Sequence, residues 1–151
     1  MVTYHKFTWI LLIVFGVFFV LAPIADLKSV ATTGLPSDHV PAFSHLSGLS
    51  WQSVKSTGIA KYVTQLEFGY ALHELVFGIL FILVAVIPFR KNERWAWWAL
   101  WVGFFASLGY SLTFGTQDKR ILAYSLVTTI GIPLVLLASA PRFFIKVKRP
   151  N

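Results

Sequence analysis

Four long apolar segments constrain this chain more than any other feature of its sequence. They lie at about residues 7–25, 68–89, 95–114 and 121–140. Each is close to the roughly 20 residues that a helix needs to cross the hydrocarbon core of a bilayer. Short polar links join the last three segments, so these helices are expected to be antiparallel neighbours. The sequence therefore predicts an all-α fold, a four-helix transmembrane bundle, in one integral membrane domain of residues 1–151.

The composition also favours a membrane protein. Charged residues make up 13% of the chain, which is about half of the roughly 25% that is usual in soluble domains. The formal net charge is +7, but the basic residues lie in short clusters beside the apolar segments, where they indicate topology and contact with lipid headgroups. Nucleic acid is therefore not expected as a partner. The chain has no cysteine, which excludes disulfides and thiolate metal sites.

The distribution of lysine and arginine predicts the orientation in the membrane. Eight basic residues lie before the first segment, between the second and third, and after the fourth: Lys6, Arg90, Lys91, Arg94, Arg142, Lys146, Lys148 and Arg149. By the positive-inside rule these stretches face the cytoplasm. Both termini of this multi-pass chain are therefore expected on the cytoplasmic side of the cell (plasma) membrane. An aromatic belt is expected at the same interface, formed by Trp9, Trp95, Trp97, Trp98 and Trp101.

One long extracytoplasmic loop, about residues 26–58, separates the first two apolar segments. Within it Val40, Phe43, Leu46 and Leu49 recur at near-helical spacing. This pattern predicts a short amphipathic helix that lies on the membrane surface.

Histidine and acidic residues in that loop raise the question of a metal site. Asp38, His39 and His45 lie close together in sequence, and Glu67 or His73 could complete a set of ligands. Their spacing matches no known metal motif, so we predict neither a metal nor a cofactor.

Polar side chains gather at one depth of the predicted bundle. The second and fourth helices run inward and the third runs outward, so their polar residues fall in the outer half. The candidate site residues are Glu67, Tyr70, His73, Glu74, Ser107, Tyr110, Ser111, Tyr124 and Thr128. Two interpretations remain open. These residues line a ligand-binding cavity in the outer leaflet, or they join the helices to one another by hydrogen bonds.

Glu74 is the most informative of these residues. It follows His73 inside an apolar run, and a carboxylate costs several kcal/mol to hold in hydrocarbon, which makes it a functional-site candidate. It lies two helical turns below Glu67, hence roughly 10 Å below the interface at 1.5 Å per residue. Adjacent residues on a helix point about 100° apart, so His73 and Glu74 cannot both face one ligand squarely.

Three stretches carry a resemblance to a known group of proteins. They are residues 70–75 (YALHEL), 94–98 (RWAWW) and 109–115 (GYSLTFG), and the likeness covers about the C-terminal two thirds of the chain. In these stretches the chain resembles small, uncharacterised four-helix membrane proteins of bacteria. The resemblance implies a four-helix bundle in a cell membrane, and it assigns no activity and no role to any residue.

The first functional hypothesis is a non-enzymatic membrane protein. It is an accessory subunit, or it binds lipid or a small apolar ligand in the polar outer-leaflet cavity. One alternative is a small membrane-embedded enzyme in which Glu74 and His73 act as acid and base on an apolar substrate. The other is a homo-oligomeric channel or transporter, which the apolar cytoplasmic half of the helices disfavours. The expected partners are membrane lipids and either a second copy of the chain or a larger membrane complex.

Overall fold

Helices account for most of the described chain. The computed structural model describes residues 7–145, and no strand occurs in that range. The elements in chain order are α1 (Thr8–Thr33), α2 (His39–Ser47), α3 (Trp51–Val54), α4 (Gly58–Val84), the π-helical segment η2 (Ala85–Phe89), α5 (Arg94–Ala99), α6 (Trp101–Tyr110), the π-helical segment η3 (Ser111–Gly115) and α7 (Lys119–Phe144). Part of the predicted orientation rests on Lys6, Lys146, Lys148 and Arg149, which lie outside the described residues.

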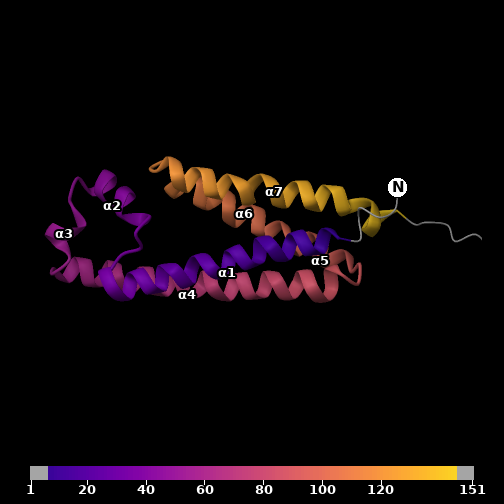
Figure 1. Ribbon diagram of the computed structural model, residues 1–151, viewed down its shortest axis with the longest axis horizontal. Coiled ribbons are helices and arrows are strands. Elements are labelled where there is room, and N and C mark those ends of the chain that lie inside the picture. The colour runs from indigo at the N-terminus through magenta and orange to yellow at the C-terminus, as the bar shows by residue number, and fades with distance from the viewer. Residues whose placement is uncertain (1–6, 146–151) are drawn as a thin grey trace, which may run out of the picture.

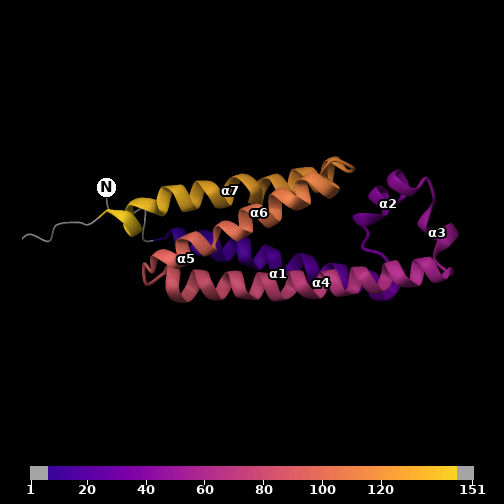
Figure 2. The ribbon, with the colours of Figure 1, turned by 180° about the vertical axis from the view of Figure 1, so that it is seen from behind.

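The long helices form two side-by-side pairs (Figure 1). α1 runs along α4, and α6 runs along α7. The view from behind shows the same arrangement (Figure 2): the two pairs lie close together near α5 and separate toward the end that holds α2 and α3. α1 begins and α7 ends at the α5 end. The halves of α1, α4, α6 and α7 that lie away from α5 therefore surround one region beside α2.

Three helical stretches are long and apolar enough to cross a membrane. Within residues 7–145 these are α1, α4 together with η2, and α7. The fourth predicted segment, 95–114, is divided into α5, α6 and η3, with the buried Leu100 between α5 and α6. An unbroken apolar α-helix of spanning length does not occur there among the described residues, so a fourth crossing stays a prediction.

α1 and α4 approach closely because glycine occupies their crossing points. A Cβ atom at Gly78 of α4 would lie 2.6 Å from the backbone carbonyl oxygen of Phe19 in α1. At Gly16 of α1, a Cβ atom would collide with the side chain of Ile82. The hydrophobic effect does little to bring helices together in lipid. Small residues that permit close packing are therefore typical of the contacts between such helices.

The apolar core fills the α5 end of the bundle. Its buried members are Leu12, Phe81, Ala85, Phe89, Ala96, Trp97, Leu100, Ile132, Leu136 and Phe143. Trp97, which the sequence places in an interfacial belt, faces this core, and its indole N–H donates to the carbonyl oxygen of Leu136 at 2.8 Å. Trp95 and Trp98 are exposed, and their place at a membrane interface stays a prediction. The core closes the bundle at this end and leaves the polar residues at the other.

Helix α1 continues past residue 25, where the first apolar segment was expected to end. It stops at Gly34, whose φ of 83° is left-handed, a conformation that favours glycine. Two hydrogen bonds from other helices hold this end of α1 in place. The indole of Trp51 donates to the carbonyl oxygen of Thr33 at 2.8 Å, and the hydroxyl of Thr64 in α4 donates to that of Gly34 at 2.7 Å.

Helix α2 occupies the place of the predicted amphipathic surface helix. Only part of the expected apolar face packs against the rest of the protein. Val40 and Phe43 contact a small core that Leu35, Trp51 and Ala60 form. Leu46 and Leu49 are 71% and 51% exposed. The helix is therefore held to the protein by one end of its apolar face, and the other end is open to the surroundings.

Candidate functional site

A cavity of about 730 Å³ is lined by side chains from both helix pairs. α1, α4, α6 and α7 all contribute to its walls, and Ser37 and Asp38 from the segment before α2 contribute as well. The cavity therefore lies where the two pairs separate (Figure 1).

The lining changes from charged to apolar along the cavity. Residues nearer the α2 end of their helices are polar or charged: Asp26, Asp38, Tyr70, His73, Asp118, Arg120 and Tyr124. Residues nearer the α5 end are mostly apolar: Phe18, Phe19, Ala22, Phe77 and Ala106. This order follows from the antiparallel helix directions, and it matches a molecule with a polar head and an apolar body.

Seven of the nine candidate residues line this cavity. They are Tyr70, His73, Glu74, Ser107, Tyr110, Tyr124 and Thr128. The other two, Glu67 and Ser111, do not line it. The structure thus brings together residues from α4, α6 and α7, and it separates two neighbours that sequence reasoning had grouped with them.

Ser111 joins helices instead of facing the cavity. Its hydroxyl donates to Ser125 of α7 at 2.8 Å and lies 3.3 Å from the hydroxyl of Thr129. It also lies 2.9 Å from the carbonyl oxygen of Ser107. The interpretation as interhelical hydrogen bonding therefore describes Ser111, while Ser107 one turn earlier lines the cavity.

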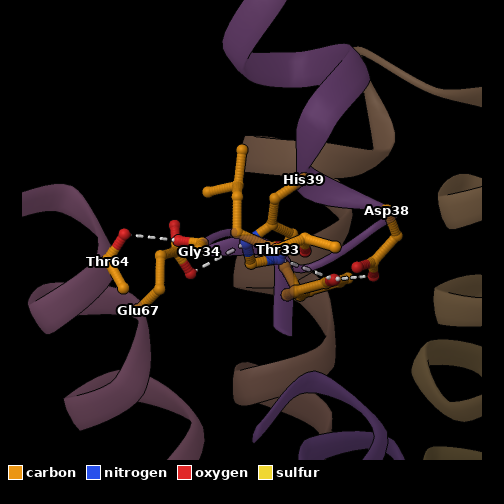
Figure 3. Close-up of polar contacts among 8 residues, drawn as sticks. Thr33, Gly34, Asp38, His39, Thr64 and Glu67 are labelled. Atoms are coloured by element: carbon orange, nitrogen blue, oxygen red, sulfur yellow. Dashed lines mark hydrogen bonds and ion pairs between the residues drawn. The ribbon is translucent and has the colours of Figure 1, made fainter. Parts of the chain in front are cut away.

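Glu67 belongs to a chain of hydrogen bonds that ties α2 to the bundle (Figure 3). His39, the first residue of α2, lies between the carboxylate of Glu67 in α4 and the phenol of Tyr110 in α6. Its Nδ1 is 2.9 Å from Glu67 Oε2, and its Nε2 is 3.2 Å from Tyr110 Oη. Tyr110 in turn donates to Asp38 Oδ2 at 3.0 Å.

With Glu67 and Asp38 ionised, this pattern of hydrogen bonds is satisfied by a charged His39. The phenol of Tyr110 has one hydrogen, which it donates to Asp38, so its oxygen can only accept from His39. The carboxylate of Glu67 accepts from the other ring nitrogen. Burial disfavours the imidazolium, but the hydrogen bond and charge of Glu67 and the charge of Asp38 outweigh that effect and raise the pKa of His39.

His39 is also held by its ring. It is 3% exposed and stacks on Phe114 of η3, with ring centroids 4.3 Å apart and an interplanar angle of 2°. The single residue therefore touches α4, α6 and η3. Because Asp38 beside it lines the cavity, this attachment fixes the position of one part of the cavity wall.

Sequence reasoning missed Asp26 as a site residue. It treats Asp26 as the start of the outer loop, whereas the structure keeps it inside α1, lining the cavity. Glu74 lines the same cavity, so the structure places two carboxylates in one wall region. A signal was available: Gly34 and Pro36, a common helix-stop pattern, lie two turns beyond Asp26.

Two polar atoms in the cavity wall have no hydrogen-bond partner among the described residues. The hydroxyl of Ser107, a residue 5% exposed, is one, and Asp38 Oδ1 is the other. Buried polar groups in proteins are nearly always paired. The described residues therefore leave the hydrogen-bonding capacity of these two atoms unused.

The residues that were weighed as metal ligands are used differently. His39 bonds to Glu67 and Tyr110, and within residues 7–145 no group of three or more His, Asp or Glu side chains is arranged to hold a metal ion.

Comparison of the chain with protein-family models, with curated proteins and with solved structures gives no match.

Proposed function

We propose that this chain is a multi-pass membrane protein that binds a lipid or a small apolar molecule in a cavity in the outer half of the bilayer. The observation that carries the proposal is the cavity of about 730 Å³ between the helix pairs, charged at one end and apolar at the other. Ligand sites in proteins have volumes of about 300–1,000 Å³ and combine apolar walls with a few polar groups.

The proposal includes a fourth membrane crossing by α5, α6 and η3, with both termini in the cytoplasm. In this topology α2 and α3 lie outside the membrane and the charged end of the cavity meets the outer interface. An amphiphile could then keep its head at the interface and its body between the helices. The positive-inside pattern and the short links on either side of this segment support the arrangement.

Cysteine labelling in intact cells tests the topology, because the natural chain has no cysteine. Single cysteines at the exposed positions Lys55, Lys91 and Thr116 report on three successive connections. A membrane-impermeant maleimide is expected to label Lys55→Cys and Thr116→Cys directly, and Lys91→Cys only after permeabilisation. Labelling of Lys55→Cys and Lys91→Cys from the same side would contradict a crossing by α4. The same result for Lys91→Cys and Thr116→Cys would contradict the fourth crossing.

Ligand retention tests the binding site. Native mass spectrometry of the purified protein is expected to detect a bound apolar molecule or lipid. Ala106→Phe places a large side chain in the cavity and is expected to abolish that species. Leu134→Phe, at a 61% exposed position of α7 outside the lining, is the matched control and should retain it. Equal retention by Ala106→Phe and the natural protein would refute binding in this cavity.

The proposed partners are membrane lipids and either a second copy or a larger membrane complex. Exposed apolar side chains along the long helices, among them Val14, Leu21, Val76, Leu80 and Val127, support direct contact with lipid chains. The same mass spectra give the number of copies in the particle and so decide between a single chain and an oligomer.

One observation favours the enzyme alternative enough to test it. His73 and Glu74 both line the cavity, so both could reach a bound substrate. If Glu74 is an acid or base in a reaction, Glu74→Gln should retain the bound molecule and leave it chemically unchanged over time. The natural protein should convert it. An identical bound species in both proteins would count against an enzyme.

A further inference from the structure

The acidic residues of this chain are concentrated at the cavity. The sequence has six aspartates and glutamates, and four of them, Asp26, Asp38, Glu74 and Asp118, line the cavity. The chain as a whole carries a net charge of +7. Among the described residues, Arg120 is the one lysine or arginine in the lining, and its side chain is 80% exposed. The cavity is therefore locally acidic in a basic protein.

Two of these carboxylates are not engaged in an ion pair among the described residues. Asp118 caps α7 and lies 3.6 Å from Arg120. Asp38 accepts from Tyr110, which is bonded to the charged His39. Asp26 and Glu74 form no ion pair with any residue that the structure describes. Unpaired carboxylates away from bulk water are costly, so a positive group placed between them would be stabilised.

A second, independent feature points to a ligand at the same place. Ser107 lines the cavity and is 5% exposed, and its hydroxyl has no hydrogen-bond partner among the residues that the structure describes. It comes from α6, on the opposite helix pair from Asp26 and Glu74 (Figure 1). A hydroxyl left unpaired in an apolar wall is explained by a molecule that occupies the space in front of it.

The aromatic lining suits a positive group as well. Tyr70 and Phe77 of α4 and Tyr110 and Tyr124 of α6 and α7 contribute rings to the wall. The faces of such rings attract cations when water is excluded. Phe18 and Phe19 extend the apolar surface toward the α5 end.

From these features we infer that the ligand is an apolar amine, whose ammonium group lies between Asp26 and Glu74 and whose hydrocarbon body points toward Phe77 and Ala106. This inference rests on the proposed function, since it names the chemical class of the molecule that the cavity binds. A neutral or anionic head would leave both carboxylates without an ion-pair partner among the described residues.

Three probes with one hydrocarbon tail and different heads test the inference. Dodecylamine, dodecanol and dodecanoate are titrated by calorimetry into the protein in phosphatidylcholine nanodiscs at pH 7, and the heat of empty nanodiscs is subtracted. Dodecylamine is expected to bind at least about tenfold more tightly than dodecanol, because a close pair of opposite charges strengthens binding by that factor or more. Dodecanoate should bind most weakly.

Acid-to-amide variants identify the source of the preference. In Asp26→Asn, in Glu74→Gln and in the double variant, amine affinity should fall toward that of the alcohol while dodecanol binding is unchanged. Glu93→Gln is the matched control, since Glu93 lies outside the cavity and bonds to Trp95, and it should keep the full preference. Retained dodecanol binding shows that each variant is folded.

The outcomes separate the two proposals. Equal affinity for amine and alcohol in the natural protein, or an unchanged preference in the double variant, overturns the amine inference and leaves the cavity intact as a binding site. If none of the three probes binds more tightly to the natural protein than to Ala106→Phe, both the inference and the proposed function fail.

Discussion

Gly78 provides a sharp test of how α1 and α4 are packed. A Cβ atom at this position would lie 2.6 Å from the carbonyl oxygen of Phe19, whereas ordinary contacts begin at 3.4 Å. The atom that it meets is backbone, so it cannot rotate away. Gly78→Ala therefore forces the two helices apart by about 0.8 Å, the difference between those distances. Overpacking of this kind costs about 1–3 kcal/mol.

Gly69→Ala is the matched control for this substitution. Gly69 lies on the same helix, and a Cβ atom there would meet nothing within 4 Å. Both variants gain the same helix propensity from alanine, so that contribution cancels in the comparison. The difference in unfolding free energy between Gly78→Ala and Gly69→Ala is then the steric cost alone.

The assay is unfolding in mixed micelles by increasing the fraction of sodium dodecyl sulfate, followed by circular dichroism and tryptophan fluorescence. Gly78→Ala should be less stable than Gly69→Ala by about 1–3 kcal/mol. If the two variants agree within about 0.5 kcal/mol, which is the usual scatter of such comparisons, then α1 does not lie against the backbone of α4 at Gly78, and the reasoning is refuted.

Three further predictions concern single contacts. Because the pKa of His39 is raised in the folded chain, its stabilising effect should be complete below its ordinary value of about 6.5 and disappear as pH rises through the higher folded value. Thermal unfolding in nanodiscs at pH 6 and pH 9 should reveal this loss, and His39→Gln should lack it. Trp97→Phe removes a buried hydrogen bond to α7 and should lower stability by about 1–3 kcal/mol in the micelle assay. Unchanged stability would mean that this hydrogen bond is not formed. Ser111→Ala should cost about 0.5–1.5 kcal/mol because it breaks bonds to α7, whereas Ser107→Ala removes an unpaired hydroxyl and should cost nothing. If Ser107→Ala costs more stability than Ser111→Ala in the same assay, the roles assigned to the two serines are wrong.

Local features of the sequence predicted the helical fold and seven of the residues that line the cavity. Hydropathy and helix length are properties of contiguous residues, so the apolar stretches that become α1, α4 and α7 could be recognised without tertiary information. The shared depth of the polar residues followed from the alternating direction of the helices. This reasoning correctly grouped Glu74, Tyr110 and Tyr124, which come from three different helices and line one cavity.

The end of a helix proved harder to predict than its apolar part. Residue 25 ends an apolar stretch, but α1 continues until Gly34 adopts a left-handed conformation. The extra turns keep Asp26 in the helix and place it in the wall of the cavity that Glu74 also lines. Hydropathy describes where a helix meets water, whereas backbone conformation and capping decide where the helix stops.

The sequence by itself determined that the chain is helical and apolar enough for a membrane. It also showed that some ionisable residues lie within the apolar stretches. Only the tertiary structure decided which of them act together. His39 meets Glu67 and Tyr110 across 28 and 71 residues of chain. Ser107 and Ser111, one turn apart, have different roles because a small rotation about the helix axis separates the cavity from the contact with α7. Hydropathy and helix periodicity are local, whereas the rotation and crossing of packed helices depend on the whole set of side chains between them.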